Sequence, residues 1–225
     1  MNPFKKVHWI DNFPKGYPWY NKIKANLIYF FGGIIIYPRN NFLSKEDILQ
    51  TKKVLKKGDV LLLGNLEESS VLFIGSPLTH TGIYAGGREV VWGVGDGIKI
   101  ASLYKVFTDY DTLVILRLPK RVKKRRRFIR KAVRFAKDQV NKPFDFDFAK
   151  NNKKSFFCSQ LVNEAYRCSG YNTGLISTRS CFIKKDDKIH KILHPHDFLT
   201  GKFKIVFVSH NLKIKNKKPI LIEKG

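Results

Sequence analysis

A cysteine at the start of a predicted helix is the residue best placed for covalent chemistry. Cys158 opens the segment CSQLVNEAYRCSG, whose apolar residues recur at helical spacing and which ends at Gly170. Unpaired N–H groups and the dipole at a helix N-terminus stabilise a thiolate, which is the nucleophilic form of cysteine. We therefore expect a lowered pKa for the Cys158 thiol and a role as nucleophile, although a buried inert thiol is the commoner use of cysteine.

A histidine at the start of a predicted strand is the candidate base for this thiol. His80 lies in SPLTHTGIYAGG, and an imidazole at a strand edge can reach across to a helix N-terminus. His190, His194 and His196 compete with it because their spacing resembles that of metal ligands. Pro195 interrupts any helix that would align these three side chains. We therefore predict no metal site and no cofactor.

The other cysteines and the composition limit the class of protein. Cys168 and Cys181 complete a set of 3 cysteines with irregular spacing and no CxxC pair, which argues against a disulfide framework and a structural zinc site. A chain of 225 residues that is 43% hydrophobic is not disordered and suits one domain with an extension or two small domains. The net charge of +25 indicates either contact with polyanions or a solvated basic surface.

The elements that must position these residues form a mostly antiparallel sheet with helices. Short strand-like runs separated by Gly-rich turns follow residue 57, in the order VLLLG, VLFIG, TGIYAG, EVVWGV, IKIAS and TLVILRL. Helical patterns cover KEDILQTKK, residues 120–141 and the segment after Cys158, and a last strand, FKIVFV, follows Lys202.

Two segments have surface properties that suggest a membrane. One face of the predicted helix over 120–141 is basic and fits either an anionic membrane or solvent; its cations include Lys123, Arg126, Arg127 and Arg130. The segment Ala25–Tyr37, ANLIYFFGGIIIY, fits an interfacial anchor, but its length favours burial as a strand or short helix in the core. The N-terminus shows no signal-peptide pattern, which predicts a cytoplasmic or peripheral membrane protein.

Five motifs in a fixed order resemble one group of thiol hydrolases. The motifs KKGDVLLLG, THTGIYAGG, VGDGIKIASL, FAKDQVNKPFDFDF and FFCSQLVNEAYRCSG occur between Leu55 and Phe207, and the histidine strand precedes the cysteine helix. This order resembles the circularly permuted NlpC-like papain-fold cysteine hydrolases, in particular their YiiX-like group with its poxvirus relative. The lecithin:retinol acyltransferase-like enzymes are a more distant branch.

The resemblance implies both a fold and a domain organisation. The fold is α+β, permuted papain-like, with an antiparallel sheet packed against helices, one of which carries the cysteine. The catalytic domain would cover residues 53–210, after an aromatic-rich extension over 1–52 and before a basic tail over 211–225.

The resemblance also implies roles for single residues. Cys158 matches the family's nucleophile and His80 matches its general base, while Gly58 and Asp59 match the GD turn that opens the first core strand. The family's KPYDF segment, which lines the cleft, matches residues 142–146. The candidate substrate contacts are Tyr84, Trp92, Phe144, Asp145 and Ser159.

The residue that should orient the imidazole departs from the family's pattern. This position is often Glu in the family, but it falls on Trp92, whose indole N–H cannot accept a hydrogen bond from an imidazole. Glu89 lies three residues earlier, and a bulge near Gly93 could bring Asp96 closer. These two carboxylates are the substitutes we consider, and a Cys–His dyad is the alternative.

The activity implied is that of a thiol hydrolase. We expect a cysteine amidase or peptidase that acts on a small amide or acylated amine through a thioester acyl-enzyme. One alternative is a lipid-directed acyltransferase or thioesterase at an anionic membrane. Another is a catalytically degenerate basic binding module. The expected partners are a small amide or acyl substrate and an anionic membrane surface, in preference to nucleic acid.

Overall fold

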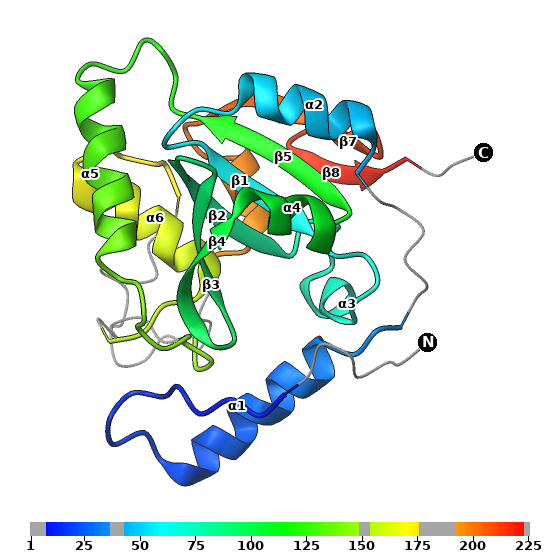
Figure 1. The fold of residues 1–225 in the computed structure, drawn as a ribbon, viewed down its shortest axis with the longest axis vertical. Coiled ribbons are helices and arrows are strands. Elements are labelled where there is room, and N and C mark those ends of the chain that lie inside the picture. Colours follow the sequence, from blue (N-terminus) through cyan, green and yellow to red (C-terminus); the bar gives the residue numbers. More distant parts are fainter. Residues whose placement is uncertain (1–7, 37–42, 149–153, 176–191, 223–225) are drawn as a thin grey trace.

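A six-stranded antiparallel sheet forms the centre of the protein (Figure 1). The computed structural model describes residues 8–36, 43–148, 154–175 and 192–222. The strand order is β4-β3-β2-β1-β5-β6. The strands are β1 (Val60–Gly64), β2 (His80–Gly86), β3 (Glu89–Val94), β4 (Gly97–Ser102), β5 (Thr112–Arg117) and β6 (Lys204–Val208).

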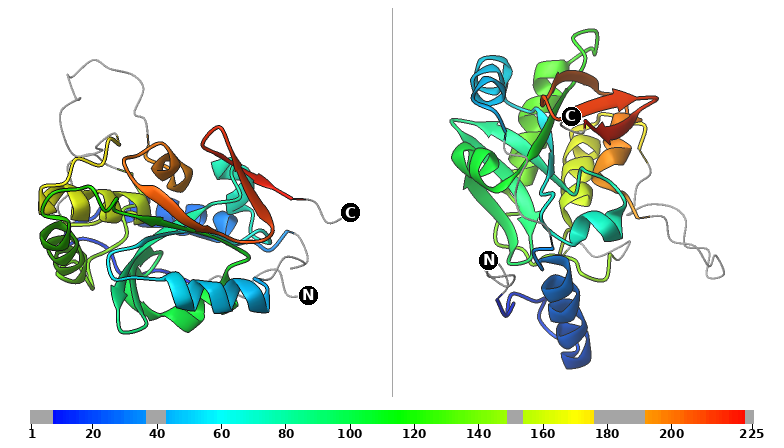
Figure 2. Two further views of the ribbon diagram at one scale, coloured as in Figure 1. Left: turned by 90° about the horizontal axis from the view of Figure 1, so that it is seen from above. Right: turned by 90° about the vertical axis from the view of Figure 1, so that its right-hand side faces the viewer.

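Helices cover both faces of this sheet, which confirms the predicted α+β class (Figure 2). The helices are α1 (Trp19–Gly32), α2 (Lys45–Val54), α3 (Ser70–Ile74), α4 (Leu103–Asp109), α5 (Arg125–Lys137), α6 (Cys158–Ser169) and the 3-10 helix η1 (Pro195–Leu199). Side chains alternate along β1, so Val60 and Leu62 pack with α5 and α6, whereas Leu61 and Leu63 pack with α4. This explains why β1 reads as an unbroken apolar run.

The GD turn anchors α6 to the sheet. Asp59 is buried, and its two carboxylate oxygens accept hydrogen bonds from Arg117 Nε at 2.8 Å and Nη2 at 2.6 Å. The backbone N–H of Lys56 donates to the same carboxylate at 2.7 Å. The Tyr166 hydroxyl of α6 donates to the Gly58 carbonyl. This turn therefore joins the start of β1, the end of β5 and the helix that carries Cys158.

One predicted strand is a helix. The run VLFIG, predicted as a strand, lies in α3 and outside the sheet. The backbone N–H of Gly75, which adopts a left-handed φ of 63°, bonds to the Val71 carbonyl and ends the helix. The prediction was wrong because periodicity cannot separate a short apolar strand from a helical turn. The helix expected over 120–141 is also shorter, since α5 begins at Arg125.

The segment expected in the core is exposed instead. Residues 25–32 of the apolar run belong to α1, which projects from the body of the protein (Figure 1 and Figure 2). The side chains of Leu27, Ile28, Phe30 and Phe31 are exposed to solvent. The expectation of burial was therefore wrong for most of the described part of this segment, because it was based on the length of the apolar run alone.

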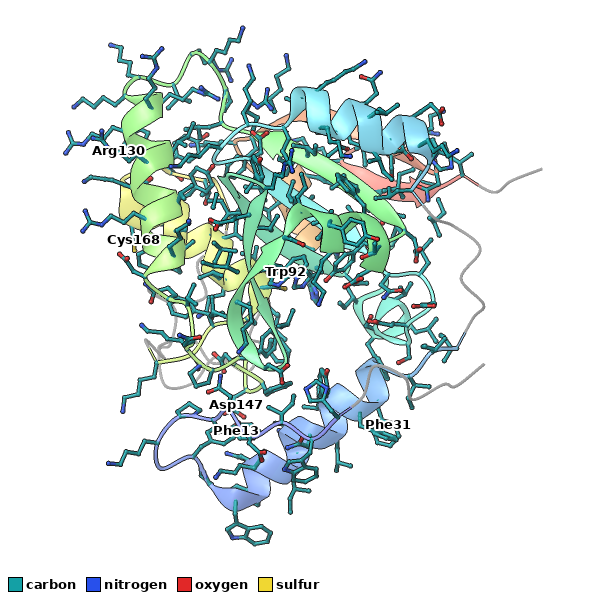
Figure 3. The ribbon with its side chains drawn as sticks, viewed as in Figure 1. Phe13, Phe31, Trp92, Arg130, Asp147 and Cys168 are labelled. Carbon is teal, nitrogen blue, oxygen red and sulfur yellow. The ribbon has the colours of Figure 1, made fainter. Side chains whose placement is uncertain are left out.

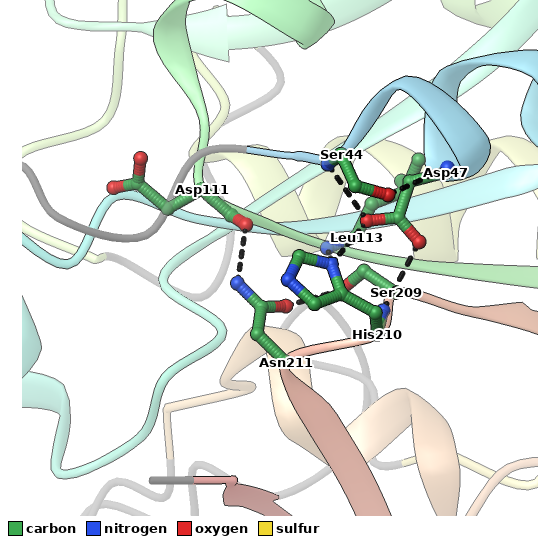
Figure 4. Close-up of polar contacts among 7 residues, drawn as sticks. All are labelled: Ser44, Asp47, Asp111, Leu113, Ser209, His210 and Asn211. Carbon is green, nitrogen blue, oxygen red and sulfur yellow. Dashed lines mark hydrogen bonds and ion pairs between the residues drawn. The ribbon is translucent and has the colours of Figure 1, made fainter. Parts of the chain in front are cut away.

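The residues after β6 form a hairpin and a polar network with α2. Residues 212–221 form a hairpin of β7 (Leu212–Lys215) and β8 (Lys218–Leu221). Asp47 of α2 accepts hydrogen bonds from the backbone N–H of Ser44 and His210, each at 3.0 Å, and contacts the His210 ring at 2.5 Å (Figure 4). Ser209 and Asn211 join this network to Asp111 and Leu113 at the start of β5. These contacts pack α2 against the connection that follows β6.

Candidate active site

Cys158 is the first residue of α6, as the sequence pattern predicts. The preceding Phe157 has no side-chain acceptor, so among the described residues no capping side chain bonds to the first-turn N–H groups. The backbone N–H groups of Thr81, Cys158 and Ser159 and the Ser159 hydroxyl all favour the thiolate of Cys158. These donors can also meet the oxygen of a carbonyl that Cys158 attacks.

A glycine on β3 lets the sheet approach the start of this helix. A Cβ atom added to Gly93 would lie 3.3 Å from the backbone nitrogen of Cys158 and 3.1 Å from Ile98 Cδ1. Few Cβ atoms tolerate such close contacts, so a larger residue would displace the N-terminus of α6. The type of residue at position 93 therefore helps to set the position of the sulfur atom.

His80 is the first residue of β2 and is enclosed by aromatic rings. Its ring stacks on Tyr110 with centroids 5.6 Å apart and planes within 5°, and it meets Trp92 edge-on at 5.3 Å. Its Nε2 atom is buried and has no hydrogen-bond partner among the described residues. An unpartnered ring nitrogen can accept a proton from a nearby group.

Packing between β2 and α6 brings the histidine and cysteine segments together. Thr81, which follows His80, has its Oγ1 atom 3.4 Å from Ser159 Oγ, and Cys158 Sγ lies 3.8 Å from the same oxygen. Tyr110 stacks on His80. Burial is the main cause of the raised pKa of the Tyr110 hydroxyl, and the negative charges of Glu68 and of a Cys158 thiolate contribute to it. Residues 80, 81, 110, 158 and 159 thus form one cluster.

Burial controls the protonation of the two candidate groups. Burial lowers the pKa of the His80 imidazole to about 4. Burial also raises the pKa of the Cys158 thiol and outweighs the hydrogen bonds that lower it. The expected lowering of the thiol pKa was therefore wrong in direction for this enclosed state, in which both His80 and Cys158 are only 9% exposed. In this enclosed state the thiol and the imidazole are both neutral.

Neither substitute carboxylate lies beside His80. Glu89 is at the far end of β3, where it pairs with Gly86, and its carboxylate contacts Lys137 Nζ at 2.5 Å. Asp96 lies in the turn after β3 and pairs with His8 Nε2 at 2.7 Å.

The rings of Trp92 and Tyr110 occupy the place where a carboxylate was sought. Tyr110 was missed by sequence reasoning, because no motif marks it. Only the pairing of β1 with both β2 and β5 brings residue 110 to residue 80.

The structure separates the predicted substrate contacts into three groups. Trp92 contacts the imidazole and Ser159 contacts the thiol. Phe144 and Asp145 pair with Phe156, two residues before Cys158, so they flank the loop that leads into α6. Tyr84 lies four residues along β2 from His80, and its hydroxyl accepts the backbone N–H of Arg88 at 3.3 Å, which places it away from the cluster.

The other sulfur and imidazole groups lie elsewhere. Cys168 is exposed toward the other end of α6, far from Trp92 (Figure 3). His194 and His196 stack on each other, whereas Cys181 and His190 lie outside the described residues. Within the described ranges no group of three His, Cys, Asp or Glu side chains could hold a metal ion.

A model of the permuted papain-like amidases, the YaeF/YiiX or C92 family, matches residues 54–207. The protein belongs to this family. The family confirms the permuted papain-like fold and the YiiX-like group that the five motifs indicate, and its members are amidases or peptidases.

Two relatives from Escherichia coli are similar to this chain. It is 25% identical to the "Probable lipoprotein peptidase YaeF" of strain K12, over 69% of this chain and 70% of that protein. The crystal structure of the metalloprotein yiiX from strain O157:H7 is 22% identical with a TM-score of 0.44. That match covers 51% of this chain and 66% of the other.

The described helices include none that is both long enough and apolar enough to cross a bilayer.

Proposed function

We propose that this protein is a cysteine amidase or peptidase in which Cys158 is the nucleophile and His80 is the general base. The substrate is a small amide or an acylated amine. The observation that supports the proposal is the contact between the start of β2 and the start of α6. Thr81, the residue after His80, has its hydroxyl 3.4 Å from that of Ser159, and Cys158 Sγ lies 3.8 Å from the same Ser159 oxygen. Membership of an amidase family supports the same reaction class.

The reaction proceeds through a thioester. Neutral His80 takes the thiol proton at Nε2 while the Cys158 sulfur bonds to the substrate carbonyl carbon. The backbone N–H groups of Cys158 and Ser159 stabilise the resulting oxyanion. The protonated imidazole then gives its proton to the departing amine as the C–N bond breaks. Water, deprotonated by the same imidazole, attacks the thioester and releases the carboxylic acid and the free thiol.

The two rings take the orienting role that a carboxylate has in the family's pattern. Stacking on Tyr110 and edge contact with Trp92 restrict rotation of the His80 ring. They supply no negative charge to stabilise an imidazolium, which is consistent with the low pKa of His80. The site is thus a Cys–His dyad with aromatic support.

Acyl-enzyme trapping tests the proposal directly. The protein is incubated with p-nitrophenyl esters and p-nitroanilides. The mass of each cysteine-containing peptide is then measured by mass spectrometry to find the acyl group. We expect the acyl group on Cys158, unchanged acylation in Cys168→Ala, and a rate at least about a hundredfold lower in His80→Ala. Equal hydrolysis by Cys158→Ala would refute the assignment and leave a basic binding module without catalysis as the better account.

The exposed apolar face of α1 favours a second candidate, a thioesterase or acyltransferase that acts on acyl chains at an anionic membrane. The same nucleophile and base serve this reaction. A series of p-nitrophenyl esters from acetate to palmitate separates the two functions. A preference for long chains supports the lipid-directed enzyme, and a preference for short chains or amides supports the amidase.

A further inference from the structure

Helix α1 presents an apolar face to solvent rather than to the protein. At 100° per residue, its exposed large side chains cover roughly half of the helix circumference, with only Lys24 among them. The exposed residues are Trp19, Tyr20, Ile23, Leu27, Ile28, Phe30 and Phe31. Figure 3 shows Phe31 on the side of α1 that faces away from the sheet. This arrangement is the reverse of an ordinary surface helix.

The inner face of α1 is held by polar contacts that fix this orientation. Asn26 is buried, and its Oδ1 accepts the backbone N–H of Ile10 at 2.7 Å while its Nδ2 donates to the Ile10 carbonyl at 3.1 Å. The Tyr29 ring packs against Gly95 in the turn after β3. Turning the helix to bury its apolar face would break these buried hydrogen bonds, which is costly.

Helix α3 lies beside the end of α1 and carries further exposed apolar side chains. Ser69, which precedes α3, donates from its hydroxyl to the Phe31 carbonyl and from its backbone N–H to Ile34 O at 2.9 Å. In α3 the side chains of Leu72 and Phe73 are 64% and 74% exposed. Large exposed apolar patches mark interaction sites on proteins.

We propose that these exposed residues of α1 and α3, the α1–α3 surface, dock into the interface of an anionic lipid bilayer. Three observations favour lipid. Tryptophan and tyrosine rings suit the headgroup region, and α1 contributes Trp19 and Tyr20. Helix α1 has no acidic residue, while Lys15, Lys22 and Lys24 can reach phosphates around its apolar face. The chain carries a net charge of +25, which attracts an anionic surface.

The length of α1 sets its position in the membrane. Its 14 residues extend about 21 Å, less than the thickness of the hydrocarbon layer, so it lies in the plane of the interface. The basic residues at the start of α5 are at the opposite end of the molecule (Figure 1). There Lys120, Lys124, Arg125, Arg126, Arg127 and Arg130 line a shallow hollow of about 600 Å³. That surface faces away from a membrane bound through α1.

Vesicle binding by the full chain tests the proposal. Vesicles of phosphatidylcholine with phosphatidylglycerol are sedimented with wild type, Leu27→Glu and the matched control Leu49→Glu. Leu27 on α1 and Leu49 on α2 are 51% and 54% exposed, so both variants should fold. We expect Leu27→Glu to weaken partitioning at least about tenfold and Leu49→Glu to leave it unchanged. A Trp9→Phe variant leaves Trp19 as the one exposed tryptophan, since Trp92 is buried. In this variant, lipids brominated on their acyl chains should quench the fluorescence of Trp19.

Three results would overturn the proposal. The first is an absence of binding to any vesicle. The second is binding that Arg126→Glu with Arg130→Glu abolishes and Leu27→Glu does not, which would assign the membrane contact to α5. The third is a dimer in sedimentation velocity that Leu27→Glu dissociates, which would make the surface a contact between two copies. The assay needs no catalysis, so its outcome is independent of the roles of Cys158 and His80.

Discussion

At the scale of single residues, burial decides how the candidate dyad behaves. The helix N-terminus and three backbone N–H groups favour a thiolate at Cys158, yet loss of hydration raises the thiol pKa. The same burial keeps His80 neutral. In the proposed mechanism a neutral base and a neutral thiol are sufficient, because the proton moves as the sulfur attacks the bound substrate. Reactivity then depends on positioning more than on a preformed thiolate.

The titration of His80 gives a prediction about stability. Its pKa of about 4 lies below the ordinary 6.5, so below pH 6.5 the unfolded chain binds a proton that the native state excludes. Stability from this group is therefore lost as the pH falls. Between pH 6.5 and pH 5 we expect a loss of about 2 kcal/mol, measured by urea unfolding. His80→Gln should lose less over the same range, and an equal loss in both proteins would contradict the assignment.

Tyr110 supplies a test of aromatic support for the base. Tyr110→Ala removes the ring stacked on His80, whereas Tyr110→Phe keeps it and removes only the hydroxyl. We expect Tyr110→Ala to lower kcat/KM for a p-nitrophenyl ester about tenfold or more and Tyr110→Phe to stay close to wild type. Imidazole signals in NMR spectra should broaden only in the alanine variant. If both variants lose the same fraction of kcat/KM, the Tyr110 hydroxyl rather than its ring supports His80.

At the scale of elements, the contact between β3 and α6 positions Cys158, the candidate nucleophile. Gly93 lies opposite the backbone of Cys158, so the sheet and the helix N-terminus approach without an intervening side chain. The GD turn holds the other end of α6 through Tyr166. The helix is thus restrained at both ends by glycine-containing segments of the sheet.

Substitution of Gly93 should affect catalysis more than folding. In Gly93→Ala the new Cβ forces the start of α6 to move by a few tenths of an ångström or more. We expect acylation of Cys158 to slow about tenfold or more, with a small change in Tm. Gly32→Ala is the control, because nothing lies within 4 Å of a Cβ at that position. An unchanged acylation rate in Gly93→Ala would show that this contact does not position the sulfur.

At the scale of the whole molecule, buried polar links connect segments that are distant in the sequence. The Asp59–Arg117 pair joins the start of β1 to the end of β5. The Asp47–His210 contact joins α2 to the connection between β6 and β7. The extension that contains α1 is joined to the sheet through Asn12, which donates to the Asp96 carbonyl at 2.7 Å. The body therefore holds α1 in place while its apolar face stays exposed.

Removal of one partner of the Asp59–Arg117 pair should destabilise the fold. Arg117→Met leaves a carboxylate that is 1% exposed without its cation, and burial already raises the pKa of Asp59. We expect a loss of about 3–5 kcal/mol in the free energy of unfolding. Adding Asp59→Asn to Arg117→Met removes the unpaired carboxylate and should recover part of the lost free energy of unfolding. A loss no larger than that of a surface pair such as Lys105–Asp109 would contradict the prediction.

Local patterns in the sequence determined most of the elements and the family. Alternating apolar residues and glycine turns predicted all six strands of the central sheet, and helical spacing placed Cys158 at the start of α6. The order of the histidine strand and the cysteine helix indicated the permuted group. These features depend on neighbours within a few residues, or on the order of motifs, so they can be read from the chain directly.

Only the tertiary structure decided which residues meet and which stay exposed. Tyr110 contacts His80 because β1 pairs with both β2 and β5. Glu89 forms an ion pair with Lys137 and does not contact His80. The raised thiol pKa follows from enclosure by distant segments, and the outward face of α1 follows from buried hydrogen bonds of Asn26. Burial and register depend on packing between segments far apart in the chain, and local periodicity carries no record of that packing.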